Sequence, residues 1–422
     1  MALKHSTKAL LGGSAAVAFG LLVWNVGNFL FFVLAARLIR PEKFGVVAAV
    51  LALTVACIVP CGGVQAAVAR RIAANHAHRE MFTGFLQHGR RVVPVGAAIG
   101  ALLAVAALRP VGADVSRAIL LTAVAVSPLP FLFGWMGLLQ GMGRFESTAT
   151  PLVALGVSRP IVLVAVAPFC SNVTAALVAN AASCVFAWLV ADALGSRNVG
   201  TPLRSKPSLR TVATAVATPM AGLSAVAILA NADVVAASVK LSGLESGHYG
   251  AITALSKGAV LLLPTAIAFV LLPRVASRHA AGHRTGSLLA LSVLLALGLG
   301  LVVAGLFALV HGPLVGIFGV DYRYASWLLA PSALAATPLA AVFMLMNHHI
   351  ARGDGRFAWS CLGLSIAVIA AYVVVGDSAT ALLWVASCAA VLALVAHEFI
   401  HGRTDQGLVA SARALVVRSG GR

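Results

Sequence analysis

The sequence predicts an all-α integral membrane protein with about 12 transmembrane helices in two six-helix bundles related by pseudo-two-fold symmetry. Of the 422 residues, 60% are hydrophobic and only 10% are charged, and the mean hydropathy is +0.99. This composition excludes a soluble globular protein. The apolar stretches exceed the roughly 20 residues that a helix needs to cross a bilayer, and they do not alternate with polar residues as the strands of a barrel would.

The apolar stretches divide into twelve segments separated by short polar connections. They cover about 12–37, 44–69, 88–108, 118–140, 147–168, 173–195, 209–240, 247–273, 286–310, 325–350, 357–376 and 379–400. The first segment follows Lys4 and Lys8, as the apolar part of a signal peptide does. It is too long for that role and lacks a small-x-small cleavage site with a soluble domain behind it, so we expect a retained helix.

Basic residues are unevenly distributed between the connections. The formal charge is 30 − 12 = +18, and most of the lysines and arginines fall in the termini and in every second loop. The positive-inside rule then predicts that both termini are cytoplasmic. The same excess predicts contact with anionic membrane lipids. No soluble basic domain is present, so we expect no nucleic-acid partner.

The two halves of the sequence resemble each other, which predicts an internal duplication. "GMGRF" (141–145) and "GDGRF" (353–357) recur at equivalent loops. "KFG" (43–45) and "HYG" (248–250) are 205 residues apart, as are Asn28 and Asp233 (248 − 43 = 233 − 28 = 205). An even number of helices per copy keeps both copies in the same orientation. We expect bundles at 1–200 and 201–402, joined by the linker "SRNVGTPLRSKPSLR", and a basic cytoplasmic tail at 403–422.

Charged residues inside transmembrane helices are candidate functional residues, because they are costly there. Lys257 lies about ten residues into the eighth helix, or about 15 Å at 1.5 Å per residue. Tyr249, Thr253 and Lys257 follow an i, i+4, i+8 pattern and share one helix face. We expect this face to line a cavity. A lysine that snorkels to the membrane interface is the alternative.

The second deep charge is Arg159, in "GVSRP" within the fifth helix. The adjacent Pro160 weakens the local helix hydrogen bonding, and Ser158 adds a polar neighbour. Arg159 either lines the cavity or forms a structural ion pair. The acids at a similar depth that could pair with it are Asp192 and Asp233.

Polar residues of the first and seventh helices complete the candidate set. Asp233 is expected near the outer end of its helix, where Arg37 of the repeat-related helix could pair with it, either as a gate or as a structural contact. Asn25 and Asn28 share a helix face and either line the cavity or hold helices together. The complete set of predicted substrate-binding residues is Asn25, Asn28, Arg37, Arg159, Asp233, Tyr249, Thr253 and Lys257.

The sequence gives no indication of an enzyme. It has no Walker A loop and no G-x-S-x-G motif, and we expect no catalytic residues, no cofactor and no metal. His348 and His349 are expected to pack at an interface, with proton coupling as the alternative. Because the deep charges Arg159 and Lys257 are both basic, the cavity should suit an anionic group such as phosphate or pyrophosphate.

Two stretches resemble those of a known transporter superfamily. They are "NFLFFVLAARLIRPEKFGVVAAV" (28–50) and "NADVV…HYGAITALSKG…LLPRVA" (231–276), together with the "GxGRF" turns. With its helix count and two halves, the chain resembles the multidrug/oligosaccharidyl-lipid/polysaccharide flippase superfamily. Its polysaccharide (O-antigen-type) flippase branch is the most similar. The chain ends after twelve helices, whereas the related lipid II flippases usually have two more.

The resemblance implies a V-shaped cleft between the bundles and transport by alternating access in a bacterial plasma membrane. The implied substrate is a polyprenyl-pyrophosphate-linked glycan, moved from the cytoplasmic to the outer leaflet for cell-surface polysaccharide such as lipopolysaccharide. The implied partners are the polysaccharide polymerase and glycosyltransferases of the same pathway.

Three other functions were weighed against a flippase. A multidrug antiporter of the same superfamily should have more cavity carboxylates. A major facilitator transporter should have a G-x-x-x-D-R-x-G-R-R-like loop, where this chain reads "ARRIAANHAHREMFTG" (69–84). An integral membrane glycosyltransferase should have catalytic acids and a large outer loop, whereas the loops on that side are short.

Overall fold

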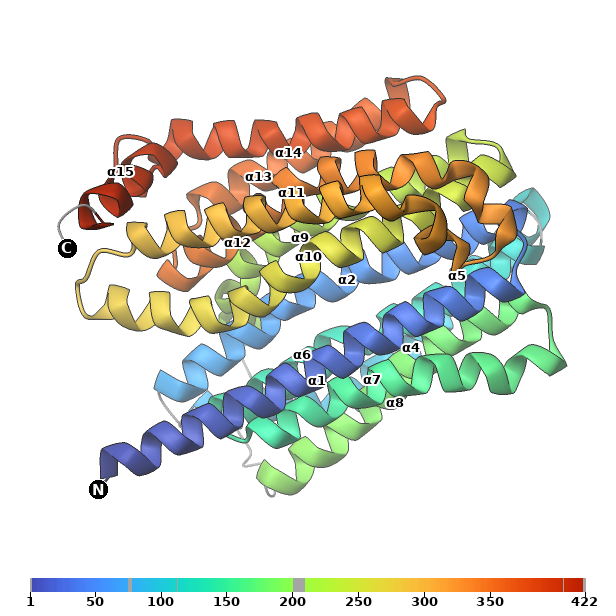
Figure 1. Ribbon diagram of the computed structural model, residues 1–422. Helices are drawn as coiled ribbons and strands as arrows, with labels where there is room; N and C mark the ends of the chain where they lie inside the picture. Colours follow the sequence, from blue (N-terminus) through green and yellow to red (C-terminus); the bar gives the residue numbers. More distant parts are fainter. Residues whose placement is uncertain (1, 75–77, 112, 200–208, 405, 420–422) are drawn as a thin grey trace. The chain divides into compact units, whose positions relative to one another are not determined.

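The computed structural model describes residues 2–74, 78–111, 113–199, 209–404 and 406–419, and their regular structure is helical throughout (Figure 1). The helices are α1 (Ala2–Leu38), α2 (Pro41–Ala74), α3 (His78–Gln87), α4 (Gly89–Val111), α5 (Ala113–Val126), α6 (Leu129–Gly141), α7 (Phe145–Val166), η1 (Ala167–Phe169), α8 (Asn172–Val199), α9 (Leu209–Lys240), α10 (Gly243–Ala280), α11 (Gly286–Gly316), η2 (Val320–Leu328), α12 (Leu329–Arg352), α13 (Arg356–Val374), α14 (Ala379–His401) and α15 (Leu408–Ser419).

The all-helical prediction and the number of spans are confirmed. Twelve stretches of the described chain are long and apolar enough to cross a membrane. The predicted span 118–140 is broken into α5 and α6. Pro128, the N-cap residue of α6, lies between them, and it cannot donate a helical backbone hydrogen bond. The α3 helix, before the third span, was not predicted. The V-shaped cleft stays a prediction.

The described chain forms two compact units, which differ from the predicted halves. Unit 1 is Met1–Ile39 with Cys57–Met220, and unit 2 is Arg40–Ala56 with Ala221–Arg422. Helices α2 and α9 therefore each contribute one end to each unit, whereas the sequence places one within each bundle. The predicted linker spans 196–210, and its residues 200–208 lie outside the described part of the chain.

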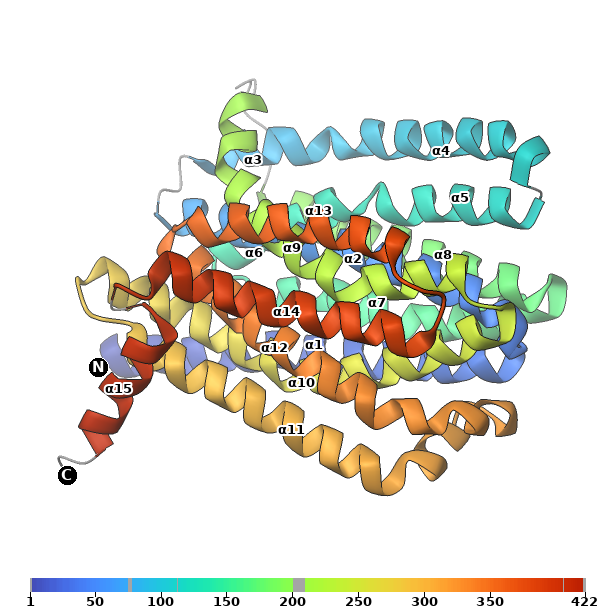
Figure 2. The same cartoon turned by 90° about the horizontal axis from the view of Figure 1, so that it is seen from above.

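Unit 1 is organised around α7 and α8. Helix α7 packs against α1, α6 and α8, and α8 also packs against α5 and α6. Helices α4 and α5 run side by side within this unit (Figure 2). Glycines permit several of these close approaches: a Cβ on Gly137 of α6 would lie 2.5 Å from the carbonyl oxygen of Gln65.

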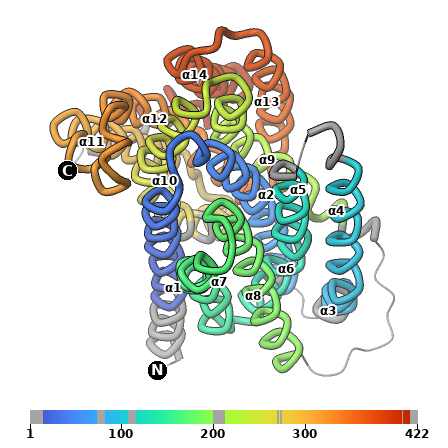
Figure 3. The backbone as a smooth tube through the Cα atoms, turned by 90° about the vertical axis from the view of Figure 1, so that its right-hand side faces the viewer, coloured from blue at the N-terminus to red at the C-terminus, as the bar shows by residue number. Residues whose placement is uncertain are grey.

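Unit 2 is organised around α12. This helix packs against α10, α11, α13 and α14, and α13 packs against α14, as the backbone trace also shows (Figure 3). The first residues of α2 belong to this unit: a Cβ on Gly247 of α10 would lie 1.8 Å from the carbonyl oxygen of Pro41. The predicted tail contains the helix α15, which packs against α11.

The two "GxGRF" turns have the same backbone conformation, but the motif sits at a different place in each. Gly143, the second glycine of "GMGRF", has a left-handed φ of 75°, whereas Gly353, the first glycine of "GDGRF", has a φ of 76°. The amide of Arg144 donates to the Leu139 carbonyl, and the amide of Asp354 donates to the His349 carbonyl. Both turns therefore end a helix in the same way, but the motif is shifted along the turn, and Asp354 is placed under the end of α12.

Candidate functional site

Close packing of α1 against α7 builds a polar site in unit 1. A Cβ on Gly27 would lie 2.1 Å from the carbonyl oxygen of Gly156, and a Cβ on Gly20 would lie 3.0 Å from that of Ala149. Small residues at seven-residue spacing on both helices let the backbones approach, as they do in other membrane helix pairs. The contact brings Asn28, the residue after Gly27, next to Arg159, three residues after Gly156.

Arg159 is held in this site by polar groups and by an aromatic ring. It is 2% exposed. Its Nη1 donates to Asn28 Oδ1 at 2.5 Å and its Nε donates to Ser183 Oγ at 3.3 Å. The guanidinium carbon lies 5.7 Å from the centroid of the Phe31 ring, within range of a cation–π interaction. Its Nη2 is buried and has no hydrogen-bond partner.

Neither acid that the sequence offers for Arg159 pairs with it. Asp192 Oδ2 lies 2.8 Å from Nη2 of Arg90, and Asp233 belongs to unit 2. Among the described residues, no carboxylate lies within ion-pair distance of Arg159. The buried positive charge is therefore solvated by an amide, a hydroxyl and a ring, and it is not neutralised.

The corresponding site in unit 2 is a buried ion pair between α9 and α10. Lys257 Nζ donates to both carboxylate oxygens of Asp233 at 2.6 Å and to the Ala230 carbonyl at 2.7 Å. Tyr249 donates its hydroxyl to Asp233 Oδ2 at 2.8 Å. Asp233 is 0% exposed and the Lys257 side chain is 14% exposed. The lysine does not snorkel to water, and its charge is neutralised.

The other predicted residues differ in how they are engaged. Thr253 is buried and donates to the Tyr249 carbonyl of its own helix. Asn25 is part-buried and donates to the Leu21 carbonyl of its own helix. Arg37 is exposed near the end of α1, in unit 1. Its pairing with Asp233, which the structure pairs with Lys257, stays a prediction.

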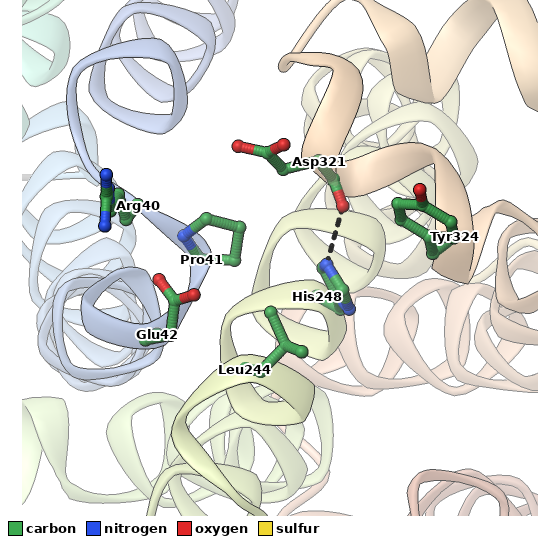
Figure 4. Close-up of a pocket in the computed structure, with 7 residues that line it drawn as sticks. All are labelled: Arg40, Pro41, Glu42, Leu244, His248, Asp321 and Tyr324. Atoms are coloured by element: carbon green, nitrogen blue, oxygen red, sulfur yellow. Dashed lines mark hydrogen bonds between the residues drawn. The ribbon is translucent and has the colours of Figure 1, made fainter.

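Unit 2 contains a pocket of about 400 Å³, and none of the predicted site residues lines it. The predicted topology would place this pocket on the outer side of the membrane. Its walls are Arg40, Pro41, Glu42, Leu244, His248, Asp321 and Tyr324 (Figure 4). His248 Nε2 lies 2.9 Å from the Asp321 carbonyl oxygen. Both acidic side chains are exposed, so the pocket is a solvated polar depression.

Comparison with solved structures identifies the fold. The lipid II flippase MurJ in an inward closed conformation matches with a TM-score of 0.69 and 10% identity, over 96% of this chain and 90% of that one. A mutant of the Vibrio cholerae MATE transporter VcmN matches with a TM-score of 0.67 and 16% identity, over 93% and 97% of the two chains. An outward-facing multidrug resistance MATE family transporter of the MOP superfamily matches with a TM-score of 0.66 and 14% identity, over 97% and 96%.

No protein-family model matches the chain, and no curated protein matches it in sequence. The chain therefore has the fold of MOP-superfamily transporters, and the solved proteins that share it are transporters or a flippase, not enzymes. The polysaccharide branch is not distinguished from the multidrug and lipid II branches by this likeness.

The sequence singled out Arg159, Asn28, Lys257, Asp233 and Tyr249, but not which of them are in contact, and it did not indicate Ser183 or Phe31 beside Arg159. Sequence reasoning grouped Asn28 with Asn25, because both share a helix face, and missed the contact with Arg159. The signal that it missed was the matched small residues of α1 and α7, whose spacing predicts close helix contact. The contact between Lys257 and Asp233 could not be read from the sequence, because nothing in it fixes how far the lysine side chain reaches towards α9.

Proposed function

We propose that this chain is a membrane transporter that moves polyprenyl-pyrophosphate-linked oligosaccharide from the cytoplasmic to the outer leaflet of a bacterial plasma membrane by alternating access. Both termini are then cytoplasmic, as the distribution of basic residues predicts. The fold shared with MOP-superfamily transporters supports a transport function. The choice of an anionic lipid rests on the charges of the two polar sites.

The observation behind this choice is Arg159. Its guanidinium is buried in unit 1 without a carboxylate among its described contacts, and one of its nitrogens has no acceptor. A buried arginine with unused donors is well suited to a phosphate, because the planar guanidinium donates two parallel hydrogen bonds to its oxygens. A pyrophosphate that reached this site would supply both the missing acceptor and the missing negative charge.

The Asp233–Lys257 pair has a different part in this proposal. Because Lys257 is already neutralised, it offers a polar but nearly uncharged surface to the substrate. Hydroxyls of a glycan bind to such groups without needing a free charge. Of the two deep basic residues expected from the sequence, Arg159 is the one without a carboxylate partner among the described residues.

A multidrug or cation antiporter of the same superfamily is the second candidate. The same ion pair favours it, because Asp233 is a fully buried carboxylate whose lysine partner could be exchanged for a cation or a proton. Two of the three solved structures reported above are MATE transporters. Such a protein should bind organic cations and lose that binding when Asp233 is replaced.

The test is transport by the purified full-length protein in proteoliposomes. Three probes are compared: a fluorescent polyprenyl-pyrophosphate oligosaccharide, the matching neutral polyprenol and a set of organic cations. We expect translocation of the pyrophosphate lipid only, reduced at least about tenfold in Arg159→Gln, a change of about 1.4 kcal/mol.

Arg197→Gln is the matched control, because Arg197 is an exposed arginine on α8 of the same unit. This variant should transport as the unchanged protein does. Efflux of organic cations that Asp233→Asn abolishes would favour the antiporter. Equal movement of the pyrophosphate lipid by Arg159→Gln and the unchanged protein would contradict the anionic site.

A further inference from the structure

Three buried histidines gather at one end of unit 2, on helices α12 and α14. His349 lies near the end of α12, and His397 and His401 lie at the end of α14. Each is 3% exposed or less. The His349 and His401 rings stack with centroids 4.3 Å apart, and the His397 centroid lies 5.0 Å from that of His349.

The sequence contains a metal-binding pattern here, although we expected no metal from the sequence. Residues 397–401 read "HEFIH", an H-E-x-x-H pattern, whose two histidines lie one turn apart on the same helix face. The third histidine comes from α12, and its contact with the pattern needs the fold. From the sequence, His349 and its neighbour His348 are expected to pack at an interface, with proton coupling as the alternative.

The ring nitrogens converge in a way that matches a metal site. One nitrogen from each of the three rings can be chosen so that all lie within 4.8 Å of one another. Asp354 Oδ2 lies 3.6 Å from His349 Nδ1 and 3.7 Å from His401 Nε2. Both distances are too long for hydrogen bonds. They are close to the about 3.3 Å that separates ligand atoms around a tetrahedral zinc ion with bonds of about 2.0–2.1 Å.

Several of these nitrogens have no other partner. His349 Nδ1, His397 Nδ1 and His401 Nε2 are buried without a hydrogen bond. A hydrogen-bond contact between two of the rings joins His349 Nε2 and His397 Nε2 at 2.9 Å. Buried polar atoms are rarely left unsatisfied in proteins, and such nitrogens are suited to hold a bound ion.

The carboxylate is oriented for the same role. Asp354 Oδ1 accepts a hydrogen bond from the backbone amide of Arg356 at 3.0 Å, which leaves Oδ2 directed at the histidines. Metal-binding carboxylates are commonly fixed by such a second hydrogen bond. The "GDGRF" turn places Asp354 directly after the left-handed Gly353 that ends α12, and the residue at the same place in the "GMGRF" turn is Arg144, which has no carboxylate.

We propose that His349, His397, His401 and Asp354 form a structural divalent-metal site that takes Zn²⁺ in tetrahedral coordination. Three imidazoles and one carboxylate are ligands that zinc accepts, and four protein ligands close the coordination sphere. The ion joins the end of α12, the turn after it and the end of α14.

The site is structural and not hydrolytic, although it contains an H-E-x-x-H pattern. In a metalloprotease the glutamate of this pattern is the general base. Here Glu398 Oε2 accepts a hydrogen bond from the Leu408 amide at 2.7 Å and so caps the start of α15. The glutamate is occupied, and no coordination position remains for water.

Zinc binding by the full-length protein tests this proposal. The protein is purified with an affinity tag that contains no histidines, treated with a chelator, and titrated with Zn²⁺ while bound metal is measured by elemental mass spectrometry. Co²⁺ is used in parallel, because its absorption spectrum distinguishes tetrahedral from octahedral coordination. We expect one tightly bound Zn²⁺ per chain and a tetrahedral Co²⁺ spectrum.

Four variants separate the ligands from their surroundings. His397→Ala and His401→Ala should lose the site. Asp354→Asn, at a side chain that is 24% exposed, should weaken binding by at least about tenfold. His348→Ala is the matched control, because His348 is also fully buried but lies 3.4 Å from Thr285 Oγ1, and it should bind as the unchanged protein does.

Two zinc-binding results would overturn the proposal. One is zinc binding by the unchanged protein no stronger than by Asp354→Asn and His397→Ala. The other is an equal loss in His348→Ala, which would show that metal binding reports only the packing of this end of unit 2. An octahedral Co²⁺ spectrum would exclude the closed four-ligand site.

Discussion

Each of the two polar sites contains a basic side chain in contact with a polar partner. The two partners occupy equivalent positions in the predicted internal duplication, but one is neutral and the other is charged. In unit 1, Arg159 donates to the amide oxygen of Asn28, and in unit 2, Lys257 donates to the carboxylate of Asp233. Asn28 and Asp233 correspond in the internal duplication. The difference between an amide and a carboxylate decides whether the buried positive charge is neutralised.

From the sequence, both basic residues were expected to line a cavity. The difference between their partners separates a structural role from a role in anion binding. A neutralised pair is stable without a ligand, because the low dielectric strengthens the attraction that offsets the cost of burial. A buried cation held only by neutral groups favours the approach of an anion. We therefore assign structural stability chiefly to the Asp233–Lys257 pair and anion recognition chiefly to Arg159.

The largest expected effect follows from removing the charge of Asp233. Asp233→Asn leaves Lys257 buried beside a neutral group, which costs about 3–5 kcal/mol in the free energy of unfolding. Chemical unfolding in detergent, followed by circular dichroism, measures this loss. Asp377→Asn is the control, because the Asp377 side chain is 69% exposed. Its ion pair with Lys240 should contribute less than about 1 kcal/mol to the free energy of unfolding.

Disrupting the helix contact that builds the unit 1 site should have the next largest effect. Gly27→Ala places a Cβ against the backbone of Gly156 and should cost about 1–3 kcal/mol, with loss of the contact between Asn28 and Arg159. Gly305→Ala, where nothing lies within 4 Å of the added atom, should leave stability unchanged or raise it by up to about 1 kcal/mol. Equal destabilisation by both would contradict the close contact.

Converting the unit 1 site to the charge pattern of unit 2 tests the comparison from the other side. Asn28→Asp gives Arg159 a carboxylate and converts a hydrogen bond that the guanidinium already strengthens into a buried ion pair, so the free energy of unfolding should rise by about 1–2 kcal/mol. Binding of pyrophosphate lipid should fall, because the arginine is then neutralised. A gain in stability without a fall in binding would remove Arg159 from the recognition site.

The smallest expected effect is that of Tyr249→Phe. It removes one of the hydrogen bonds to Asp233, while Lys257 still binds both oxygens. We expect a loss of about 1.5 kcal/mol in the free energy of unfolding, the low end for a hydrogen bond to a charged group, because Lys257 still neutralises the carboxylate. A loss as large as that of Asp233→Asn would mean that the tyrosine, and not the lysine, holds the carboxylate.

The sequence predicted the fold well because membrane spans follow from composition. Twelve apolar segments gave twelve spans, since the bilayer requires long apolar helices. The position of Arg159 and Lys257 inside helices was also readable. Their partners were not, because Asn28 meets Arg159 only through the approach of α1 to α7, and Asp233 meets Lys257 only through the approach of α9 to α10.

The histidine cluster shows the same limit in another form. The pattern at 397–401 was present in the sequence and was overlooked, whereas its contact with His349 depends on α12 packing against α14. The division of α2 and α9 between the units was likewise not readable, because hydropathy identifies a span but not its neighbours.

The most direct test of the central claim is binding of polyprenyl-pyrophosphate lipid by native mass spectrometry in two charge-altered forms. One is Arg159→Gln, and the other is the double variant Asp233→Asn, Lys257→Met, which removes the ion pair without leaving either charge alone. We predict that the first loses selective binding over the neutral polyprenol and that the second retains it. Retention in the first with loss in the second would contradict the assignment of anion recognition to Arg159.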